Sequence, residues 1–538
     1  MAIPSHKLFL VFMSLLLVFL FLSPRSSFSH PLLSTSCLSH ESQALLRFKD
    51  ALNISLTSSR VNLTSWVNGT DCCTNWTGIS CDNHTNHVVS LNIHPLFAEG
   101  VISESLCQLR FLTSLTISLT SGTVIPPCLR NLSYIRYLDL SGNSFTGMIP
   151  PFVCSLTRLT ELHLSYNQLS GSIPASLGSL SSLTELDLSV NQLSGSIPAS
   201  LGSLSSLTEL YLFANLLSGS IPASLGSLSS LTELYLFANL LSGSIPASLG
   251  SLSSLTELHL SDNQLSGSIP ASLGSLSSLT ELDLSRNQLN GSIPASLGSL
   301  SSLTELDLSH NQLSGSITAS LGSLSLLRNL YLSNNELRGN IPDSLGNLSL
   351  LQVLDGVSNR FNETISSSSL PPSLVVLGLS LNHHQLISEN FFHKLTRLSS
   401  LSLSDCVLNI STIWIPSFQL YELSLMSCTI DGEFPPWIST QFSLERLELT
   451  NASLVGVIPS WLWETSPLRI LNLANNFFSG NIPYSLGKLF QLQFLNLANN
   501  KISGMIPASL SNCSSLIVLN LGNNSLKGSL PYEFSRLL

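Results

Sequence analysis

Hydrophobic and polar positions recur along this chain with a period of 24 residues. The repeated unit reads LxxLxLxxNxLxGxIPxxLxxLxx, as in residues 183–206, LTELDLSVNQLSGSIPASLGSLSS. A unit this short cannot bury its own leucines, so the pattern predicts a stack in which each repeat packs against its neighbours. The asparagine of the unit recurs at Asn143, Asn167, Asn191, Asn215, Asn239, Asn263, Asn287, Asn311, Asn335 and Asn359.

Less regular copies extend this pattern in both directions, giving about nineteen repeats over residues 88–538. The repeats at 207–230 and 231–254 are identical in sequence, which indicates tandem duplication. The additional copies begin at Val88, Leu112, Ile135, Leu374, Leu398, Leu420, Leu444, Leu468, Leu492 and Leu516.

Alternation within each unit predicts a short strand with an inner and an outer face. Leu186 and Leu188 should point inward, and Glu185, Asp187 and Ser189 should point outward onto the concave sheet. Each asparagine amide is expected to satisfy backbone groups at the turn, forming a ladder between repeats. The period and pattern are those of leucine-rich repeats. We therefore predict an α/β solenoid, a leucine-rich-repeat superhelix with a parallel concave β-sheet.

The first residues predict entry into the secretory pathway. Lys7 precedes an apolar run over residues 8–22, so residues 1–29 are expected to form a signal peptide. An uncleaved anchor is the alternative, although the run is shorter than the ~20 residues that span a bilayer. Thirteen Asn-x-Ser/Thr sequons predict a glycoprotein: Asn53, Asn62, Asn68, Asn75, Asn83, Asn131, Asn290, Asn347, Asn362, Asn409, Asn451, Asn512 and Asn523.

Residues 30–87 differ from the repeats and are expected to cap their exposed first leucines. Ser39 is a candidate N-cap for a helix over residues 41–52. Apolar residues on one face of that helix should pack on the array. In an oxidising compartment four cysteines of this cap should be paired: Cys37, Cys72, Cys73 and Cys81.

A helix followed by W…CC.W.G..C and then by LxxLxLxxNxLxGxIP repeats resembles the plant leucine-rich-repeat receptor-like kinases, receptor-like proteins and polygalacturonase-inhibiting proteins. Residues 414–463 resemble the corresponding segment of receptor-like proteins of the fungal-xylanase-receptor type. The resemblance implies pairing of Cys37 with Cys72 and of Cys73 with Cys81. It also implies an extracellular or plasma-membrane location, no enzymatic activity, and signalling through partner co-receptor kinases in defence or development.

The sequence departs from the receptor-like pattern at its end, because residue 538 falls inside a repeat and no C-terminal cap follows. Beyond the first residues there is no apolar segment of spanning length. We therefore expect either a truncated or a naturally soluble form. Membrane association would require a missing C-terminal segment, a partner or an uncleaved signal.

The other cysteines carry weaker expectations. Cys107 and Cys128 lie at similar heights in neighbouring repeats and could form a bridge, whereas Cys154 is too distant from Cys107. Cys406 and Cys428 occupy the asparagine position of adjacent repeats, where buried thiols are favoured over a disulfide. Cys513 is expected at a core leucine position.

Composition and motifs exclude several classes of function. Only 10% of residues are charged and the net charge is −10, which argues against nucleic-acid binding. No motif of a hydrolase, a nucleotide-binding protein or a zinc enzyme is present. We therefore predict a non-enzymatic protein without cofactor and without a metal site.

Two features of the outward strand positions are candidate ligand contacts. Seven glutamates share one strand position, and the simplest interpretation is a solvated, duplicated face; the alternative is an acidic strip for a basic peptide or protein. Four aromatic residues should cluster on neighbouring strands, either by duplication of a chance pair or as a binding site. The candidate ligand-binding residues are Tyr211, Phe213, Tyr235, Phe237, Glu209, Glu233 and Glu257.

The resemblance implies an ectodomain that binds a peptide or a microbial protein on its concave face. The alternative is a secreted inhibitor of microbial cell-wall-degrading enzymes, similar to the polygalacturonase inhibitors. The length of the array and residues 414–463 favour the receptor.

Overall fold

A computed structural model gives the fold of most of the chain. It describes residues 37–52, 63–93, 100–118, 124–362, 365–382, 386–430, 432–464 and 467–536. The expected signal peptide at 1–29 and the sequons at Asn53 and Asn62 lie outside the described residues.

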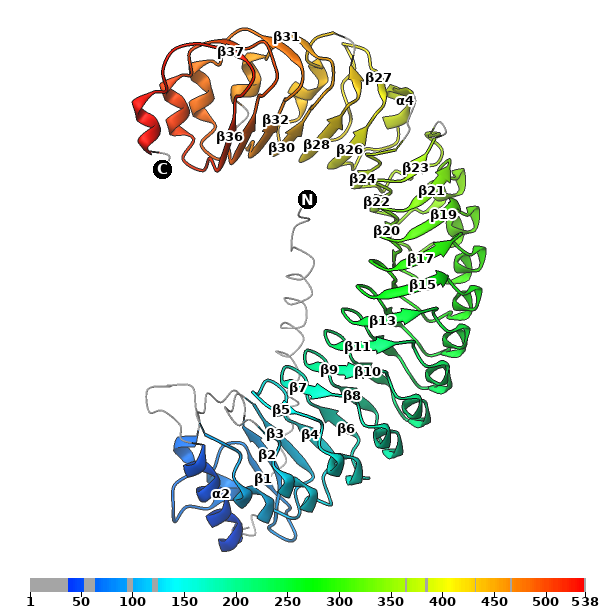
Figure 1. Cartoon of the computed structure of the whole chain (residues 1–538), viewed down its shortest axis with the longest axis vertical. Coiled ribbons are helices and arrows are strands. Elements are labelled where there is room, and N and C mark those ends of the chain that lie inside the picture. Colours follow the sequence, from blue (N-terminus) through cyan, green and yellow to red (C-terminus); the bar gives the residue numbers. More distant parts are fainter. Residues whose placement is uncertain are drawn as a thin grey trace, which may run out of the picture.

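The described residues form a curved solenoid whose strands line the inner side of the arc (Figure 1). The inner sheet has one parallel strand for each of the nineteen repeats, and this confirms the predicted fold class. These strands are β2 (Val88–Ile93), β3 (Ser114–Ile117), β4 (Tyr137–Asp139), β6 (Glu161–His163), β8 (Glu185–Asp187), β10 (Glu209–Tyr211), β12 (Glu233–Tyr235), β14 (Glu257–His259), β16 (Glu281–Asp283), β18 (Glu305–Asp307), β20 (Asn329–Tyr331), β22 (Val353–Asp355), β24 (Val376–Gly378), β26 (Ser400–Ser404), β28 (Glu422–Met426), β30 (Arg446–Glu448), β32 (Ile470–Asn472), β34 (Phe494–Asn496) and β36 (Val518–Asn520).

Shorter parallel ladders follow the asparagine turns. The ten-stranded ladder comprises β5 (Thr146–Gly147), β7 (Gln168–Gly171), β9 (Gln192–Gly195), β11 (Leu216–Gly219), β13 (Leu240–Gly243), β15 (Gln264–Ser268), β17 (Gln288–Gly291), β19 (Gln312–Ser316), β21 (Glu336–Gly339) and β23 (Arg360–Phe361). Smaller ladders comprise β25 (Leu386–Ser388), β27 (Val407–Asn409) and β29 (Thr429–Ile430), then β31 (Val455–Val457) and β33 (Phe477–Ser479), then β35 (Ser503–Gly504) and β37 (Ser525–Leu526).

Most repeats return to the next strand through one turn of 3-10 helix on the outer side of the arc (Figure 1). These turns also pack closely: a Cβ on Gly226 would lie 2.3 Å from the carbonyl oxygen of Ser248 in the next repeat. The 3-10 helices are η1 (Leu63–Ser65), η2 (Glu104–Gln108), η3 (Pro127–Asn131), η4 (Pro151–Ser155), η5 (Ala175–Ser179), η6 (Ala199–Ser203), η7 (Ala223–Ser227), η8 (Ala247–Ser251), η9 (Ala271–Ser275), η10 (Ala295–Ser299), η11 (Ala319–Ser323), η12 (Asp343–Asn347), η13 (Pro436–Thr440), η14 (Ser460–Glu464), η15 (Tyr484–Lys488), η16 (Ala508–Asn512) and η17 (Tyr532–Arg536).

The core is a continuous column of leucines, as the alternation predicts. Leu186 and Leu188 are fully buried, while Glu185 and Asp187 remain partly exposed. Ser189 lies on the same side of the strand as Asp187, as expected: its hydroxyl donates to the Asp187 carboxylate at 2.6 Å, although the residue is only 1% exposed.

The asparagine ladder is present and joins each repeat to both neighbours. Asn239 is 6% exposed, and its Nδ2 donates to the carbonyl oxygens of Leu212 at 3.0 Å and Leu236 at 3.1 Å. The backbone N–H of Leu217, in the preceding repeat, donates to Asn239 Oδ1 at 3.0 Å. The residue before this asparagine, Ala238, has a φ of 54°, so the turn places the amide between two repeats.

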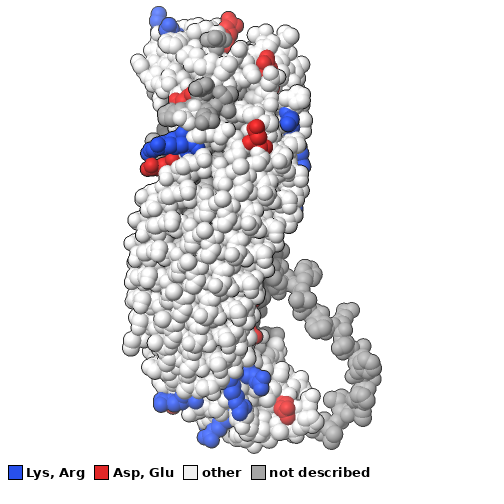
Figure 2. All heavy atoms as spheres, turned by 90° about the vertical axis from the view of Figure 1, so that its right-hand side faces the viewer, with Lys and Arg blue, Asp and Glu red and all other residues white. Residues whose placement is uncertain are grey.

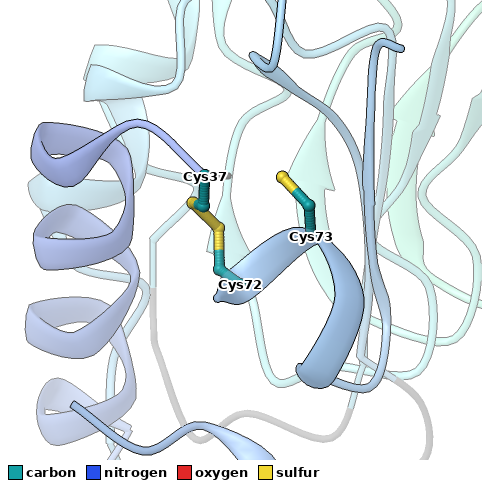
Figure 3. Close-up of side chains that lie close together, drawn as sticks. All are labelled: Cys37, Cys72 and Cys73. Carbon is teal, nitrogen blue, oxygen red and sulfur yellow. A yellow bond between two sulfur atoms is a disulfide. The ribbon is translucent and has the colours of Figure 1, made fainter. Parts of the chain in front are cut away.

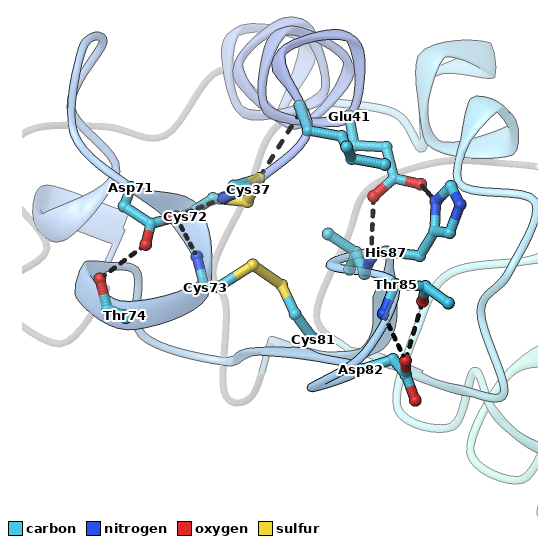
Figure 4. Close-up of a disulfide and its surroundings, with 12 residues drawn as sticks. Cys37, Glu41, Asp71, Cys72, Cys73, Thr74, Cys81, Asp82, Thr85 and His87 are labelled. Carbon is cyan, nitrogen blue, oxygen red and sulfur yellow. Dashed lines mark hydrogen bonds and ion pairs between the residues drawn. A yellow bond between two sulfur atoms is a disulfide. The ribbon is translucent and has the colours of Figure 1, made fainter. Parts of the chain in front are cut away.

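The N-terminal cap is built on helix α2 (Ser39–Ala51), followed by the short helix α3 (Cys72–Asn75) and strand β1 (Ile79–Cys81), which pairs antiparallel with β2. The predicted apolar face of α2 is buried. The expected N-cap role of Ser39 was wrong, because Ser39 is the first helical residue and Leu38 occupies the N-cap position. Glu41 is 1% exposed, and its carboxylate accepts from the backbone N–H of Val88 and contacts His87 (Figure 4).

Disulfides pair Cys37 with Cys72 and Cys73 with Cys81, as the resemblance implied. Figure 3 shows Cys73 beside the first of these bridges. Because all four sulfur atoms are bonded in pairs, this sulfur-rich corner offers no thiolate to a metal. The Asp71 carboxylate stabilises this corner by accepting a hydrogen bond from the backbone N–H of Cys37 at 2.7 Å (Figure 4).

Two further disulfides lie within the array. Cys107 and Cys128 form a disulfide, which their similar positions in neighbouring repeats made possible. The preference for free thiols at Cys406 and Cys428 was wrong, because these residues form a disulfide with Cα atoms 4.5 Å apart. Stacked ladder positions lie at a distance that a disulfide spans. The remaining cysteines, Cys154 and Cys513, are free and buried.

The irregular region near residue 390 includes the short helix α4 (Glu389–Phe392). Among the described residues, no helix has the length and hydrophobicity needed to cross a membrane.

Candidate ligand-binding site on the concave sheet

Seven glutamates form a column along the concave sheet, which we call the glutamate column. Strand pairing places each directly beside the next, from Glu161 to Glu305. Between residues 159 and 327 the sequence contains one lysine or arginine, Arg286, and its guanidinium lies 3.7 Å from Asp262. The column is therefore acidic with little compensating positive charge. Its members are Glu161, Glu185, Glu209, Glu233, Glu257, Glu281 and Glu305.

The convex side has a different character. Figure 2 shows that side nearly free of charged residues across its broad middle, with lysines and arginines gathered toward the two ends. The middle repeats thus concentrate their charge on the concave strands. A positively charged ligand would be attracted to the concave face rather than to the convex one.

Tyr211, Phe213, Tyr235, Phe237 and His259 form a half-buried group on the concave side of β10, β12 and β14, which we call the aromatic cluster. The rings of Phe213 and Phe237 stack with centroids 4.5 Å apart, and those of Tyr211 and Tyr235 lie 5.0 Å apart. The His259 ring meets Tyr235 edge-on at 4.7 Å. The structure thus brings together the four aromatic residues singled out from the sequence and adds His259.

The tyrosine hydroxyls connect the aromatic cluster to the glutamate column. The Tyr211 hydroxyl lies 2.7 Å from Glu209 Oε2 and 2.6 Å from Glu233 Oε2, and the Tyr235 hydroxyl donates to Glu257. A hydroxyl has one proton to donate, so both Tyr211 contacts are favourable only if one carboxyl is protonated. Burial raises the pKa of Glu233, which is consistent with that arrangement.

Burial also raises the pKa values of both tyrosine hydroxyls, and their bonds to the glutamates raise them further. The tyrosines are therefore neutral hydrogen-bond donors at any physiological pH. Their rings stay fixed by bonds at the hydroxyl end, which lowers the entropy lost when a ligand packs against them.

One member of the glutamate column titrates near neutral pH. Burial raises the pKa of Glu185 to about 7; the charges of Glu209, Glu161 and Asp187 add to this effect, and His163 opposes it. The side chain is 25% exposed and accessible to protons. The charge of the concave face therefore becomes less negative as the pH falls below 7.

Two histidines stand beside pairs of glutamates. His259 Nε2 lies 3.5 Å from Glu257 Oε2 and 3.7 Å from Glu281 Oε2. At His163 the two ring nitrogens face different carboxylates: Nε2 is 3.7 Å from Glu161 and Nδ1 is 3.5 Å from Glu185. In both groups the three ligand atoms lie within 4.8 Å of one another.

Reasoning from the sequence placed Glu281 in the glutamate column but did not single out His259, because the two residues are 22 positions apart and become neighbours only when strands β14 and β16 stack. The signal was nevertheless present. His259 occupies the strand position that holds Tyr235 one repeat earlier, so it belongs to the same surface as the four aromatic residues.

The described sequon asparagines all have exposed side chains. Their glycosylation stays a prediction, and none lies on the three strands of the aromatic cluster. They are Asn68, Asn75, Asn83, Asn131, Asn290, Asn347, Asn362, Asn409, Asn451, Asn512 and Asn523.

Known sequence families match most of the array and its cap. The leucine-rich repeat N-terminal domain matches residues 38–82, a leucine-rich repeat region matches residues 96–242, and the leucine rich repeat matches residues 253–313. Four further single repeats match at 326–348, 467–489, 491–513 and 515–537.

Similar proteins of plants include receptors and an inhibitor. The chain is 34% identical to the receptor-like protein EIX2 of Solanum lycopersicum over 127 residues, which cover 21% of this chain and 12% of that protein. It is 37% identical to the polygalacturonase inhibitor of Vitis vinifera over 139 residues, covering 26% and 38% respectively. These matches therefore span well under half of either relative.

Solved structures match over nearly the whole chain. The complex of PEPR1 with AtPEP1 is 33% identical with a TM-score of 0.76, covering 93% of this chain and 77% of that one. The Arabidopsis receptor kinase HAESA, solved with the peptide hormone IDA and the co-receptor SERK1, is 34% identical with a TM-score of 0.74, covering 93% and 88%.

The fold, the cap and these similarities define a leucine-rich-repeat ectodomain of the plant receptor class. Within that class, the chain belongs to the leucine-rich-repeat family, and parts of it are similar to plant receptor-like proteins.

Proposed function

We propose that this chain is an extracellular recognition ectodomain that binds a basic peptide or a protein with a basic segment on its concave face. The observation that carries the proposal is the aromatic cluster, whose half-buried rings lie beside the glutamate column. Partly exposed, immobilised aromatic rings are typical of binding hot spots. The adjoining carboxylates would attract and orient positive charge.

The location and signalling route follow from the family. The protein would act at the outer face of the plasma membrane or in the apoplast, and its signal would pass through partner kinases. Support comes from the similarity to HAESA, which was solved with a peptide hormone and a co-receptor. Defence and development are both compatible with this role.

The test compares binding of an array of synthetic basic peptides by the purified chain and by a Tyr211→Ala/Tyr235→Ala double variant. We expect the variant to lose at least tenfold in affinity, about 1.4 kcal/mol. Tyr331→Ala is the matched control, because Tyr331 holds the same strand position in β20, outside the aromatic cluster. Equal affinity of the double variant and the original chain would refute the site.

A second candidate function is inhibition of a microbial cell-wall-degrading enzyme, favoured by the similarity to the Vitis vinifera polygalacturonase inhibitor. It is tested by adding the purified chain to a fungal polygalacturonase and measuring the release of reducing sugar. Inhibition that is unchanged in the Tyr211→Ala/Tyr235→Ala variant, together with no peptide binding, would favour the inhibitor over the receptor.

A further inference from the structure

His259 and its two glutamates are arranged differently from an ordinary ion pair. Nε2 is buried and faces both carboxylates, and its nitrogen–oxygen contacts are longer than a charge-assisted hydrogen bond. A charged imidazole donating to a carboxylate would be drawn to about 2.8 Å. Here the two N–O separations are 3.5 and 3.7 Å, which is too long for such a bond.

The same separations suit ligands that share a metal ion. Zn²⁺ binds imidazole nitrogen and carboxylate oxygen at about 2.0–2.2 Å in tetrahedral geometry, which places two ligand atoms about 3.4 Å apart. The distances from His259 Nε2 to Glu257 Oε2 and Glu281 Oε2 are within a few tenths of an ångström of this value. All three atoms already lie within 4.8 Å of one another.

The surroundings also favour a cation. Asp283 is the strand neighbour of His259, so three carboxylates surround one imidazole, and the region has almost no lysine or arginine. The Tyr235 hydroxyl donates to Glu257, the kind of outer hydrogen bond that orients a metal ligand. Glu257 and Glu281 are 29% and 43% exposed, so the site opens onto the concave face.

We propose that Glu257, His259 and Glu281 form a binding site for Zn²⁺, with the fourth coordination position open to the concave surface. His259 would ligate through Nε2, and each glutamate through one carboxylate oxygen. Neither sequence reasoning nor the role of peptide receptor includes such a site. The site shares Glu257 and His259 with the proposed peptide-binding surface, but all the metal ligands come from this chain, so Zn²⁺ binding can be measured without any peptide.

The group at His163 provides an internal control. It contains the same residue types at the equivalent positions of strands β6 and β8. However, its two carboxylates face opposite ring nitrogens of the imidazole. One imidazole cannot direct both nitrogens at a single ion. The His163 group should therefore bind Zn²⁺ much more weakly than the His259 group.

The experiment is calorimetric titration of the purified full chain with Zn²⁺ near neutral pH, after removal of metal by a chelator. We compare His259→Tyr and Glu281→Gln with the matched variants His163→Tyr and Glu185→Gln. Tyrosine is native at the equivalent position of β10 and β12, so these histidine changes suit the fold. Circular dichroism of every variant verifies folding, and the visible absorption of Co²⁺ reports tetrahedral coordination.

We expect one Zn²⁺ per chain, with affinity at least about tenfold weaker in His259→Tyr and in Glu281→Gln and unchanged in the two His163-side variants. We also expect the tetrahedral Co²⁺ spectrum to disappear in His259→Tyr. The proposal is overturned if the chain does not bind Zn²⁺, if His259→Tyr binds it as tightly as the original chain, or if His163→Tyr weakens binding equally. Because the probe is the metal alone, such a result leaves the peptide-binding proposal standing.

Discussion

Replacing Asn239 by alanine would break one rung of the asparagine ladder while leaving the leucine column intact. The side chain is 6% exposed and makes bonds to two repeats. Its removal leaves the backbone N–H of Leu217 without its acceptor. The carbonyl oxygens of Leu212 and Leu236 each lose one donor but keep another, from Asn215 at 3.2 Å and Asn263 at 3.0 Å.

The magnitude follows from this difference. One buried N–H left unsatisfied costs about 1–3 kcal/mol, and each lost but replaceable hydrogen bond costs about 0.5–1.5 kcal/mol. We therefore expect Asn239→Ala to lower the free energy of unfolding by about 3 kcal/mol. Because each repeat contacts only its neighbours, the loss should be concentrated in residues 207–254.

The assay is urea unfolding followed by circular dichroism, combined with hydrogen exchange of peptides that cover residues 207–254. Gln264→Ala is the control, because Gln264 is exposed and its replacement should change the free energy by less than about 0.5 kcal/mol. A loss for Asn239→Ala as small as that of the control, or faster exchange spread evenly over the array, would refute the reasoning.

Three further predictions concern charge, disulfides and glycans. Since the pKa of Glu185 is raised to about 7 in the folded state, folding binds a proton between about pH 4.5 and 7, and the free energy of unfolding should fall as the pH rises through that window. Allowing for solvent screening, the fall is about 1–2 kcal/mol, and urea unfolding of Glu185→Gln should not show it. Cys428→Ala should lower the free energy of unfolding by about 3 kcal/mol through loss of the Cys406 bridge, and mass mapping of the original chain should find only Cys154 and Cys513 as thiols. Enzymatic deglycosylation of the secreted chain should convert exposed sequon asparagines to aspartate, whereas unmodified asparagine at all eleven described sequons would contradict the prediction.

The repeat architecture could be predicted because one short pattern determines both the strand and its neighbour. When Glu209 recurs 24 residues later as Glu233, the stacking of equivalent strands places the two side by side. The glutamate column and the four aromatic residues were foreseen in this way. Each is a property of one position repeated, and no detailed geometry is needed to find it.

Features that depend on local geometry, rather than on the repeated position of one residue, were missed. His259 contacts Glu281 because its imidazole extends toward the next strand. The repeated sequence pattern does not predict how far a side chain extends. Pairing of Cys406 with Cys428 depends on the local distance between two turns rather than on residue type.

Residues 207–230 and 231–254 are identical in sequence, so the aromatic cluster exists because this repeat is present in two copies. Phe213 stacks on its own duplicate, Phe237, and Tyr211 packs on its own duplicate, Tyr235. A gene with one copy of this repeat would present one tyrosine and one phenylalanine with no equivalent partner. A third copy would lengthen the ring stack by one further strand spacing, about 4.8 Å, without any new sequence. Unequal recombination could therefore enlarge or remove this recognition surface in a single step, while the solenoid on either side keeps its structure.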